Sequence, residues 1–305
     1  LSMYMLMKVV PRNLFVLCED GKVFLFLEGG IKMKRIGFIG AGSMAEAMIK
    51  GLVKSGAMEP EAIFVTNQSN TARLRELSET YGVCGEADTA KVAARSDTLV
   101  LAMKPKDAAG GIAALRPYLR KEQLLISVLA GIPIHTIQHY AGLELPVVRA
   151  MPNTSAAIQK SATAFAASPL VTKEQMQEAA DLFATVGSVT IVEESALDAV
   201  TAVAGSGPAF VYRFVEALQA SAAELGLPEK TAKQLIIDMM AGAAQMLETG
   251  RDPSVMRKEI TSAGGTTEAG LRMLDDHQFE QTVISCVKEA ANRSAELRDM
   301  FAAKI

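Results

Sequence analysis

The sequence predicts an α/β fold over residues 33–194, followed by an all-helical domain over residues 195–305. Two patterns predict this division. From Met33 onward, short apolar runs of strand length alternate with segments of helical spacing. This alternation is typical of a parallel sheet covered by helices on both faces. After Glu194 the segments have helical character only.

Composition and charge narrow the function classes. The chain has 305 residues, of which 50% are hydrophobic. This suffices for a substantial core and about two domains. The formal net charge is −3, with acids and bases interspersed, so we expect no nucleic-acid partner. No apolar run reaches the ~20 residues of a membrane span. The three cysteines lack metal-ligand spacing, so we expect reduced thiols in a cytoplasmic protein with no metal.

Residues 1–32 have a different character from the rest. Glu28-Gly29-Gly30 can be encoded by a purine-rich, ribosome-binding-like stretch just upstream of Met33. We therefore expect residues 1–32 to be a translated leader or extension. The alternative is a genuine β-hairpin that turns at Asp20-Gly21, a common turn dipeptide. The intact mass of the protein from its source distinguishes the two.

The expected elements follow in order. Strands are expected at 35–40, 62–67, 98–103, 124–129, 147–151, 162–166 and 189–192. Helices are expected at 44–55 and 71–81, and after a capping box formed by Thr172 and Gln175, with Gly187 as the stop of that helix.

The second domain has the start and stop signals of several helices. A helix starts near Ser195, Gly226 and Pro228 separate two more, and Asp252-Pro253 opens another. The last, over 267–300, is broken near Asp275-Asp276. An apolar face of small and flexible residues is either ordinary core or a dimer interface, and we expect a homodimer. Its members are Met239, Met240, Ala243, Ala244 and Met246.

The most specific local motif is G-x-G-x-x-A at residues 40–45, directly after a strand and opening a helix. Gly40 permits the tight turn, Gly42 lets a pyrophosphate approach the backbone, and Ala45 keeps the helix close to the strand. The helix N-terminus offers free N–H donors to phosphates. These features predict a Rossmann-type dinucleotide site that includes Ala41, Ser43 and Met44.

The next strand end indicates which dinucleotide binds. NAD-preferring sites usually carry an acid there, for the ribose 2′-hydroxyl. Here the loop is Asn67-Gln68-Ser69-Asn70, without a carboxylate, and Arg73 and Arg75 follow. We therefore predict that Asn67, Gln68 and Ser69 bind NADPH, with NADH as the alternative cofactor. The competing interpretation is a polar loop that caps its own helix.

Two further strand ends are expected at the same crevice, because ligands of open α/β sheets bind at the carboxyl ends of strands. They supply Ala102, Met103, Lys104 and Pro105, and then Ala130 and Gly131. Lys104 either approaches the ligand or is a solvated lysine before a proline turn.

A second cluster precedes the last helix. Residues 262–267 read Ser-Ala-Gly-Gly-Thr-Thr, and we predict that Ser262, Gly264, Gly265, Thr266 and Thr267 bind the substrate. Backbone N–H groups at a helix N-terminus, with hydroxyls, form a cradle for an anion such as a carboxylate. The alternative is an ordinary Gly-Gly loop with Thr266 as N-cap.

Five ordered stretches carry a family resemblance that runs from Met33 to the end of the chain. They are 38–44, 102–105, 149–154, 198–210 and 262–267. On these the chain resembles the pyrroline-5-carboxylate reductases. The resemblance implies NADPH-dependent reduction of 1-pyrroline-5-carboxylate to L-proline, the last step of proline biosynthesis, by a dimer that often assembles further into rings.

The same resemblance implies roles for individual residues. The 262–267 loop would bind the substrate carboxylate, the Thr267 hydroxyl would lie near the ring nitrogen as the catalytic group, Glu194 would fall near the substrate, and Asn153 near the cofactor. An imine is readily protonated, so no histidine acid is required. The family usually has proline where this chain has Ala263. The alternatives are a reductase of a related cyclic imine and a non-catalytic dinucleotide-binding regulatory protein.

Overall fold

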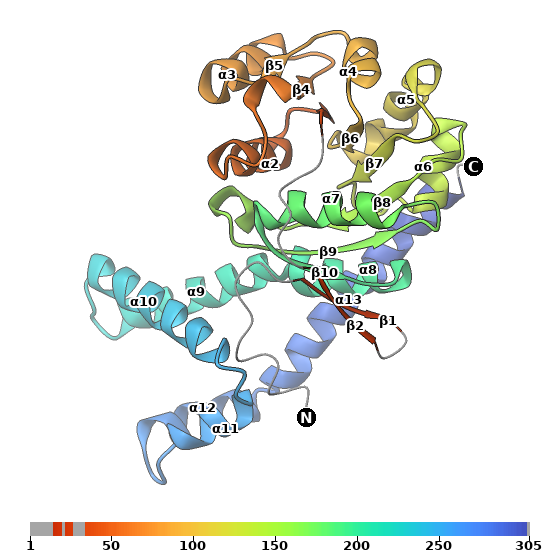
Figure 1. The fold of residues 1–305 in the computed structure, drawn as a ribbon. Helices are drawn as coiled ribbons and strands as arrows, with labels where there is room; N and C mark the ends of the chain where they lie inside the picture. The colour runs from red at the N-terminus through yellow and green to blue at the C-terminus, as the bar shows by residue number, and fades with distance from the viewer. Residues whose placement is uncertain (1–14, 20–21, 27–33, 304–305) are drawn as a thin grey trace. The chain divides into compact units, whose positions relative to one another are not determined.

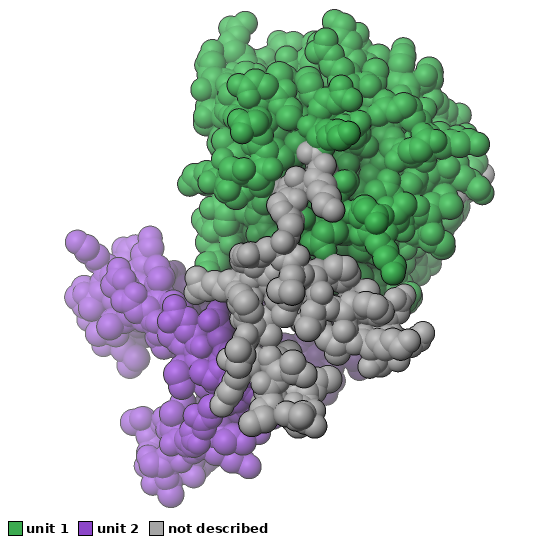
Figure 2. All heavy atoms as spheres, viewed as in Figure 1, with its two compact units in different colours: residues 1–205, 290–305 green, residues 206–289 purple. Residues whose placement is uncertain are grey.

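The computed structural model describes residues 15–19, 22–26 and 34–303. Two compact units are distinguished by their internal contacts (Figure 2). The first comprises residues 1–205 together with 290–305, and the second comprises residues 206–289. Residues 195–205 and the end of the last helix therefore group with the sheet.

The first unit is built on an eight-stranded sheet in the order β10-β9-β8-β7-β6-β3-β4-β5 (Figure 1). Each predicted strand has a counterpart in it: β3 (Ile36–Ile39), β4 (Ile63–Thr66), β6 (Thr98–Leu101), β7 (Leu124–Ser127), β8 (Val147–Met151), β9 (Ser161–Ala167) and β10 (Gly187–Ile191). The sequence analysis missed β5 (Cys84–Gly85), which is too short to form a pattern.

One pair of strands departs from the expected parallel arrangement. β9 runs antiparallel to β8, whereas the other pairs in this sheet are parallel. Residues 152–160, which contain the short 3-10 segment η4 (Thr154–Ile158), separate β8 from β9. A parallel return needs a crossover of a dozen or more residues, so the short connection requires the antiparallel direction.

Helices cover both faces of the sheet, as the alternation of strands and helices predicts. One core contains side chains from α2 (Ser43–Lys54), α3 (Thr71–Tyr81) and α7 (Lys173–Ala184). The opposite core contains side chains from α4 (Thr89–Arg95), α5 (Ala108–Ala113) and α6 (Ile134–Ala141).

The strand residues alternate between these two cores. In β3, Phe38 packs into the first and Ile39 into the second. Because every such side chain leaves water, each contributes about 1.5–3 kcal/mol to folding.

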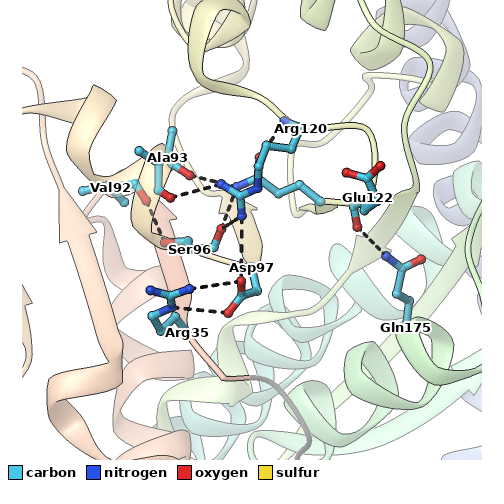
Figure 3. Close-up of polar contacts among 10 residues, drawn as sticks. Arg35, Val92, Ala93, Ser96, Asp97, Arg120, Glu122 and Gln175 are labelled. Atoms are coloured by element: carbon cyan, nitrogen blue, oxygen red, sulfur yellow. Dashed lines mark hydrogen bonds and ion pairs between the residues drawn. The ribbon is translucent and has the colours of Figure 1, made fainter.

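Polar contacts fix the amino ends of the central strands (Figure 3). Arg35 precedes β3 and Asp97 precedes β6, and their side chains pair at 3.4 Å. Arg120 donates to the Ser96 carbonyl oxygen at 2.7 Å and lies 3.8 Å from Asp97. Gln175, beside them, donates to the Glu122 carbonyl oxygen at 3.0 Å. The opposite, carboxyl ends of the strands remain for a ligand.

The helix preceding β10 begins as predicted and ends differently. Thr172 and Gln175 form the capping box of α7. The prediction that Gly187 stops this helix is wrong, because α7 ends at Ala184 and Gly187 is the first residue of β10. A Cβ on Gly187 would lie 2.0 Å from the Ser161 carbonyl oxygen, so the close approach of β9 requires glycine there.

The segment after the sheet is a series of short turns. It comprises η5 (Glu194–Ala196), α8 (Leu197–Val200) and a π-helical turn at Thr201–Gly205. The end of α13 (Phe279–Ala302) returns to this segment, where Ser294 donates to Asp198 at 2.8 Å. Arg298 also forms an ion pair with Asp198.

The second unit is helical, as predicted. It contains α9 (Gly207–Glu224), α10 (Glu229–Leu247), α11 (Pro253–Glu259), α12 (Thr266–Asp276) and the start of α13. Asp252 caps α11 and Pro253 is its first residue. The predicted break lies at His277-Gln278, where Gln278 has a φ of 54°. Within residues 206–289, which are all described, the buried side chains are Ala222, Ala232 and Ile236.

Near the amino end, β1 (Phe15–Glu19) and β2 (Lys22–Phe26) pair antiparallel, with Glu19 opposite Lys22. This pairing agrees with the hairpin alternative, although Asp20-Gly21 itself lies outside the described residues. The start of the native chain stays a prediction. In the described ranges, no helix has the length and apolar character to cross a membrane.

Candidate active site

A cavity of about 910 Å³ opens at the carboxyl ends of β3, β4 and β6. This is where the strand order reverses direction along the chain, the usual ligand position in an open α/β sheet. Ten predicted cofactor residues line it: Gly40, Ala41, Gly42, Ser43, Asn67, Gln68, Ser69, Ala102, Met103 and Lys104. The other five do not: Met44, Pro105, Ala130, Gly131 and Asn153.

The two glycines of the turn are needed for different reasons. Gly40 has a φ of +117°, and a Cβ there would lie 2.5 Å from the Ala102 carbonyl oxygen. Gly40 therefore allows β3 and β6 to end side by side. A Cβ on Gly42 would meet no atom within 4 Å. The fold does not fill the space above Gly42, which leaves it open to a ligand.

The amino end of α2 presents donors to this cavity. Gly42 is the N-cap of α2 and supplies no side-chain acceptor to the first turn. The first N–H groups of a helix have no partner within the helix, and together with the helix dipole they favour an anion. Ala45 is fully buried and lets the helix lie against β3.

The loop after β4 is held by hydrogen bonds within the loop, and it also lines the cavity. The Asn67 side-chain oxygen accepts from the N–H groups of Ser69 and Asn70, at 3.1 and 3.0 Å. The Asn70 side chain accepts from the Arg73 N–H and so caps α3. Because the Asn67 oxygen is bonded within the loop, its NH₂ group is the part left to donate to a ligand.

Arg73 lines the cavity but its guanidinium is bonded to protein groups. It pairs with Glu46 and with Glu76, and it donates to the Ala41 carbonyl oxygen at 3.2 Å. The hydrogen bond to Glu76, followed by the contact with Glu46, raises the pKa of Arg73. Arg75 is exposed and does not line the cavity.

Lys106 is a cavity residue that the sequence analysis missed. It lies with Lys104 at the end of β6, on the short 3-10 turn η2 (Pro105–Asp107). Within the described ranges, neither ammonium has a carboxylate within 4 Å. The repeat Lys-Pro-Lys after a strand was the available signal.

Two of the five predicted cofactor residues that do not line the cavity, Gly131 and Asn153, have contacts within the protein. Gly131 has a φ of +74°, and a Cβ there would lie 3.2 Å from Leu297 Cβ in α13. The Asn153 side chain donates to the Ala204 carbonyl oxygen at 3.1 Å and accepts from the Ser155 N–H at 3.0 Å. Each residue therefore has a partner within the protein, and its role toward the cofactor stays a prediction.

Glu194, predicted near the substrate, holds elements of the first unit together. One carboxylate oxygen accepts from the Ile134 N–H at 2.8 Å and from Arg149 at 3.2 Å. The Arg149 side chain is only 5% exposed. Glu194 therefore caps α6 and neutralises a buried cation in β8.

The predicted anion cradle lies in the second unit, just before α12. Gly264 has a φ of +70°, and its N–H donates to the Glu268 carboxylate at 2.8 Å. The Gly265 N–H donates to the Ser262 carbonyl oxygen at 3.0 Å. Gly265 is the N-cap of α12 and offers no side-chain acceptor. The donors left for an anion include the first-turn amides of Thr266 and Thr267, their hydroxyls and the Ser262 hydroxyl.

Comparison with known proteins gives consistent results for both units. Residues 194–297 match the family described as pyrroline-5-carboxylate reductase dimerisation. Residues 35–131 match the family described as NADP oxidoreductase, coenzyme F420-dependent.

Curated relatives cover nearly all of the chain. Pyrroline-5-carboxylate reductase 2 of Bacillus subtilis is 56% identical over 271 residues, which is 88% of this chain and 97% of the relative. The Arabidopsis thaliana pyrroline-5-carboxylate reductase is 37% identical, over 86% of this chain and 95% of the relative.

Solved structures of pyrroline-5-carboxylate reductases match this chain over most of its length. The Coxiella burnetii pyrroline-5-carboxylate reductase has a TM-score of 0.81 at 35% identity, covering 87% of this chain and 98% of that one. The Plasmodium falciparum pyrroline carboxylate reductase, solved with NADP bound, has a TM-score of 0.80 at 26% identity, covering 88% of this chain and 100% of that one.

Proposed function

The chain belongs to the pyrroline-5-carboxylate reductase family, and from that premise we propose which of its residues bind the cofactor and the substrate. It is an oxidoreductase that reduces 1-pyrroline-5-carboxylate to L-proline with NAD(P)H, in proline biosynthesis. The observation that carries the assignment is 56% identity to a reductase of this name over 88% of the chain.

The cavity residues fit a dinucleotide. The open space at Gly42, beside the uncapped start of α2, suits a pyrophosphate. Asn67, Gln68 and Ser69 follow the second strand without a carboxylate, which suits a 2′-phosphate. Lys104 and Lys106 add positive charge at the end of β6. When bound, NADPH supplies the hydride that reduces the C=N bond.

The loop before α12 is the proposed substrate site. The N–H groups and hydroxyls of Thr266 and Thr267 would hold the substrate carboxylate, and Gly264 shapes the turn through its positive φ. The Thr267 hydroxyl would bond to the ring nitrogen and orient the imine. The imine is readily protonated, so the main contribution of these residues is to hold the ring in a reactive position.

Thr267→Ala tests this assignment. We expect turnover to fall at least several-fold, because a positioned hydroxyl is lost from the reacting nitrogen. The measurement is NADPH oxidation with 1-pyrroline-5-carboxylate, run beside larger and smaller cyclic imines. The matched control is Thr249→Ala, whose hydroxyl bonds to the Met246 carbonyl oxygen in the same unit.

The possible outcomes test the substrate, the enzymatic role and the role of Thr267 separately. Wild-type protein that oxidises NADPH only with another cyclic imine would show a related reductase instead. Wild-type protein that binds NADPH and reduces no imine would favour a regulatory role. Unchanged kinetics in Thr267→Ala alone would remove this residue from the site.

The family match over residues 194–297 also supports self-association through the helical domain. We propose a cytoplasmic homodimer that assembles further into rings.

The proposed preference for NADPH predicts a higher kcat/KM with NADPH than with NADH. Equal or better efficiency with NADH would contradict the interpretation of the 67–70 loop.

A further inference from the structure

The side chain of Arg73 reaches from α3 to the glycine turn and carries contacts that the proposed function does not use. We propose that Arg73 is a positioning residue for the phosphate-binding turn, and not a ligand of the 2′-phosphate of NADPH. The inference rests on the proposed function only in that a dinucleotide occupies the cavity.

The first argument is that the donors of Arg73 are already engaged. Its side chain is 19% exposed, and its three nitrogens each have a protein acceptor. Nε donates to the Ala41 carbonyl oxygen at 3.2 Å, Nη2 pairs with Glu46, and Nη1 lies 2.8 Å from Glu76. A guanidinium held from three sides is poorly placed to turn toward a ligand phosphate.

The second argument concerns the direction of a peptide group. Ala41 is the middle residue of the Gly40-Ala41-Gly42 turn. In a trans peptide the C=O of one residue and the N–H of the next point in opposite directions. By holding the Ala41 carbonyl, Arg73 therefore fixes the direction of the Gly42 N–H away from itself. Gly42 lines the cavity, so the bond orients a donor of the phosphate site.

The third argument is electrostatic. Glu46 lies in the first turn of α2, close to where the cofactor phosphates would bind. An unpaired carboxylate there would repel them. Arg73 neutralises Glu46, and the other Glu46 oxygen accepts from the Tyr81 hydroxyl at 3.1 Å. Burial first, and then Glu46, raises the pKa of Tyr81, so its phenol stays a donor at neutral pH.

The two roles of Arg73 predict different cofactor selectivity. NADPH and NADH share the pyrophosphate and differ at the 2′-position. Loss of a positioning residue weakens both cofactors by the same factor, whereas loss of a 2′-phosphate ligand weakens NADPH alone. The ratio of the two dissociation constants therefore distinguishes the roles.

The experiment measures Kd for NADPH and for NADH, by nicotinamide fluorescence and without substrate. The variants are Arg73→Gln, Arg73→Lys and Tyr81→Phe, and the control is Arg75→Gln on the exposed face of the same helix. In Arg73→Gln we expect both Kd values to rise about tenfold, because a small misplacement of binding groups has large effects. The NADPH to NADH ratio should stay within about twofold of wild type.

The remaining variants refine the test. Arg73→Lys should recover part of the affinity by pairing with Glu46, and Tyr81→Phe should raise both Kd values less than Arg73→Gln does. In steady-state assays the KM for NADPH should rise by a larger factor than kcat falls, because the turn binds a part of the cofactor that does not react. Melting curves without cofactor establish that each variant is folded. If Arg73→Gln does not fold, Arg73→Lys and Tyr81→Phe carry the comparison.

Two results would overturn the inference. One is a rise in Kd confined to NADPH, which would make Arg73 a direct ligand. The other is an unchanged Kd for both cofactors in a folded Arg73→Gln protein. Because binding is measured without imine, a wild-type protein that fails to reduce 1-pyrroline-5-carboxylate would refute the proposed function and leave this comparison intact.

Discussion

Gly40 and Gly42 lie two residues apart, yet the structure constrains them differently. Gly40 has both a positive φ and a close neighbour in Ala102, just after β6, whereas the Gly42 backbone is extended and its surroundings are open. The first glycine is needed to form the fold. At Gly42 a larger residue would cause no clash in the protein without ligand.

Alanine at position 40 should therefore reduce the stability of the fold, whereas alanine at position 42 should reduce NADPH binding. Gly40→Ala should lower the free energy of unfolding by about 1–3 kcal/mol or more, because of backbone strain and the clash with Ala102. Gly42→Ala should leave the melting temperature nearly unchanged and weaken NADPH binding at least tenfold. Denaturant unfolding and fluorescence titration measure the two effects. Unimpaired NADPH binding by Gly42→Ala would place the pyrophosphate elsewhere.

For three residues the sequence did not show which protein groups they contact. Glu194, Gly131 and Asn153 were assigned to ligands, and the structure shows that each also has a contact within the protein. Their partners are Ile134, Leu297 and Ala204, which lie 51 or more residues away in sequence. Such pairings depend on the tertiary fold and leave no local signal.

At the scale of elements, local chemistry set several helix boundaries. The Thr172 capping box and the Asp252-Pro253 start were predicted from neighbouring residues alone and are confirmed. The antiparallel direction of β9 was not predicted, and the helix stop predicted at Gly187 is wrong. The length of a connection determines the direction of β9, and the approach of a neighbouring strand explains Gly187.

The end of α13 provides a test at this scale. Asp198 accepts from Ser294 and pairs with Arg298, and its side chain is 13% exposed. Asp198→Ala should lower the free energy of unfolding by about 1–3 kcal/mol, because two donors lose their acceptor. Urea unfolding measures the change. The control Asp299→Ala removes a 70% exposed carboxylate and should have almost no effect. Equal effects of the two variants would mean that Asp198 does not anchor α13.

At the scale of the whole molecule, the helical unit has few buried residues of its own. Within residues 206–289, large apolar side chains such as Leu235, Ile237 and Met239 are about half exposed. Exposed apolar surface of this extent marks an interaction site. Its position within the matched dimerisation region supports a second copy of the chain as the partner.

Met239→Glu should therefore weaken self-association, because a charge would be buried at the contact without a partner. Sedimentation equilibrium should show a rise in the dimer dissociation constant of at least a hundredfold. Lys233→Glu, an exposed charge on the same helix, should leave the assembly unchanged. A Met239→Glu protein that stays dimeric at low micromolar concentration would place the interface on another face.

The sequence by itself determined the alternation of strands and helices, the glycine turn, the helix caps and the family. Each depends on residues close together in the chain, and local backbone preferences and periodic burial act at that range. Only the tertiary structure decided that Arg73 is bonded to Glu46 and Ala41, that Lys106 lines the cavity, and that the Gly264 and Gly265 amides are bonded to Glu268 and Ser262. Whether a polar group remains free to bind a ligand depends on whether residues distant in sequence lie close enough to bond to it. Only folding brings such residues together.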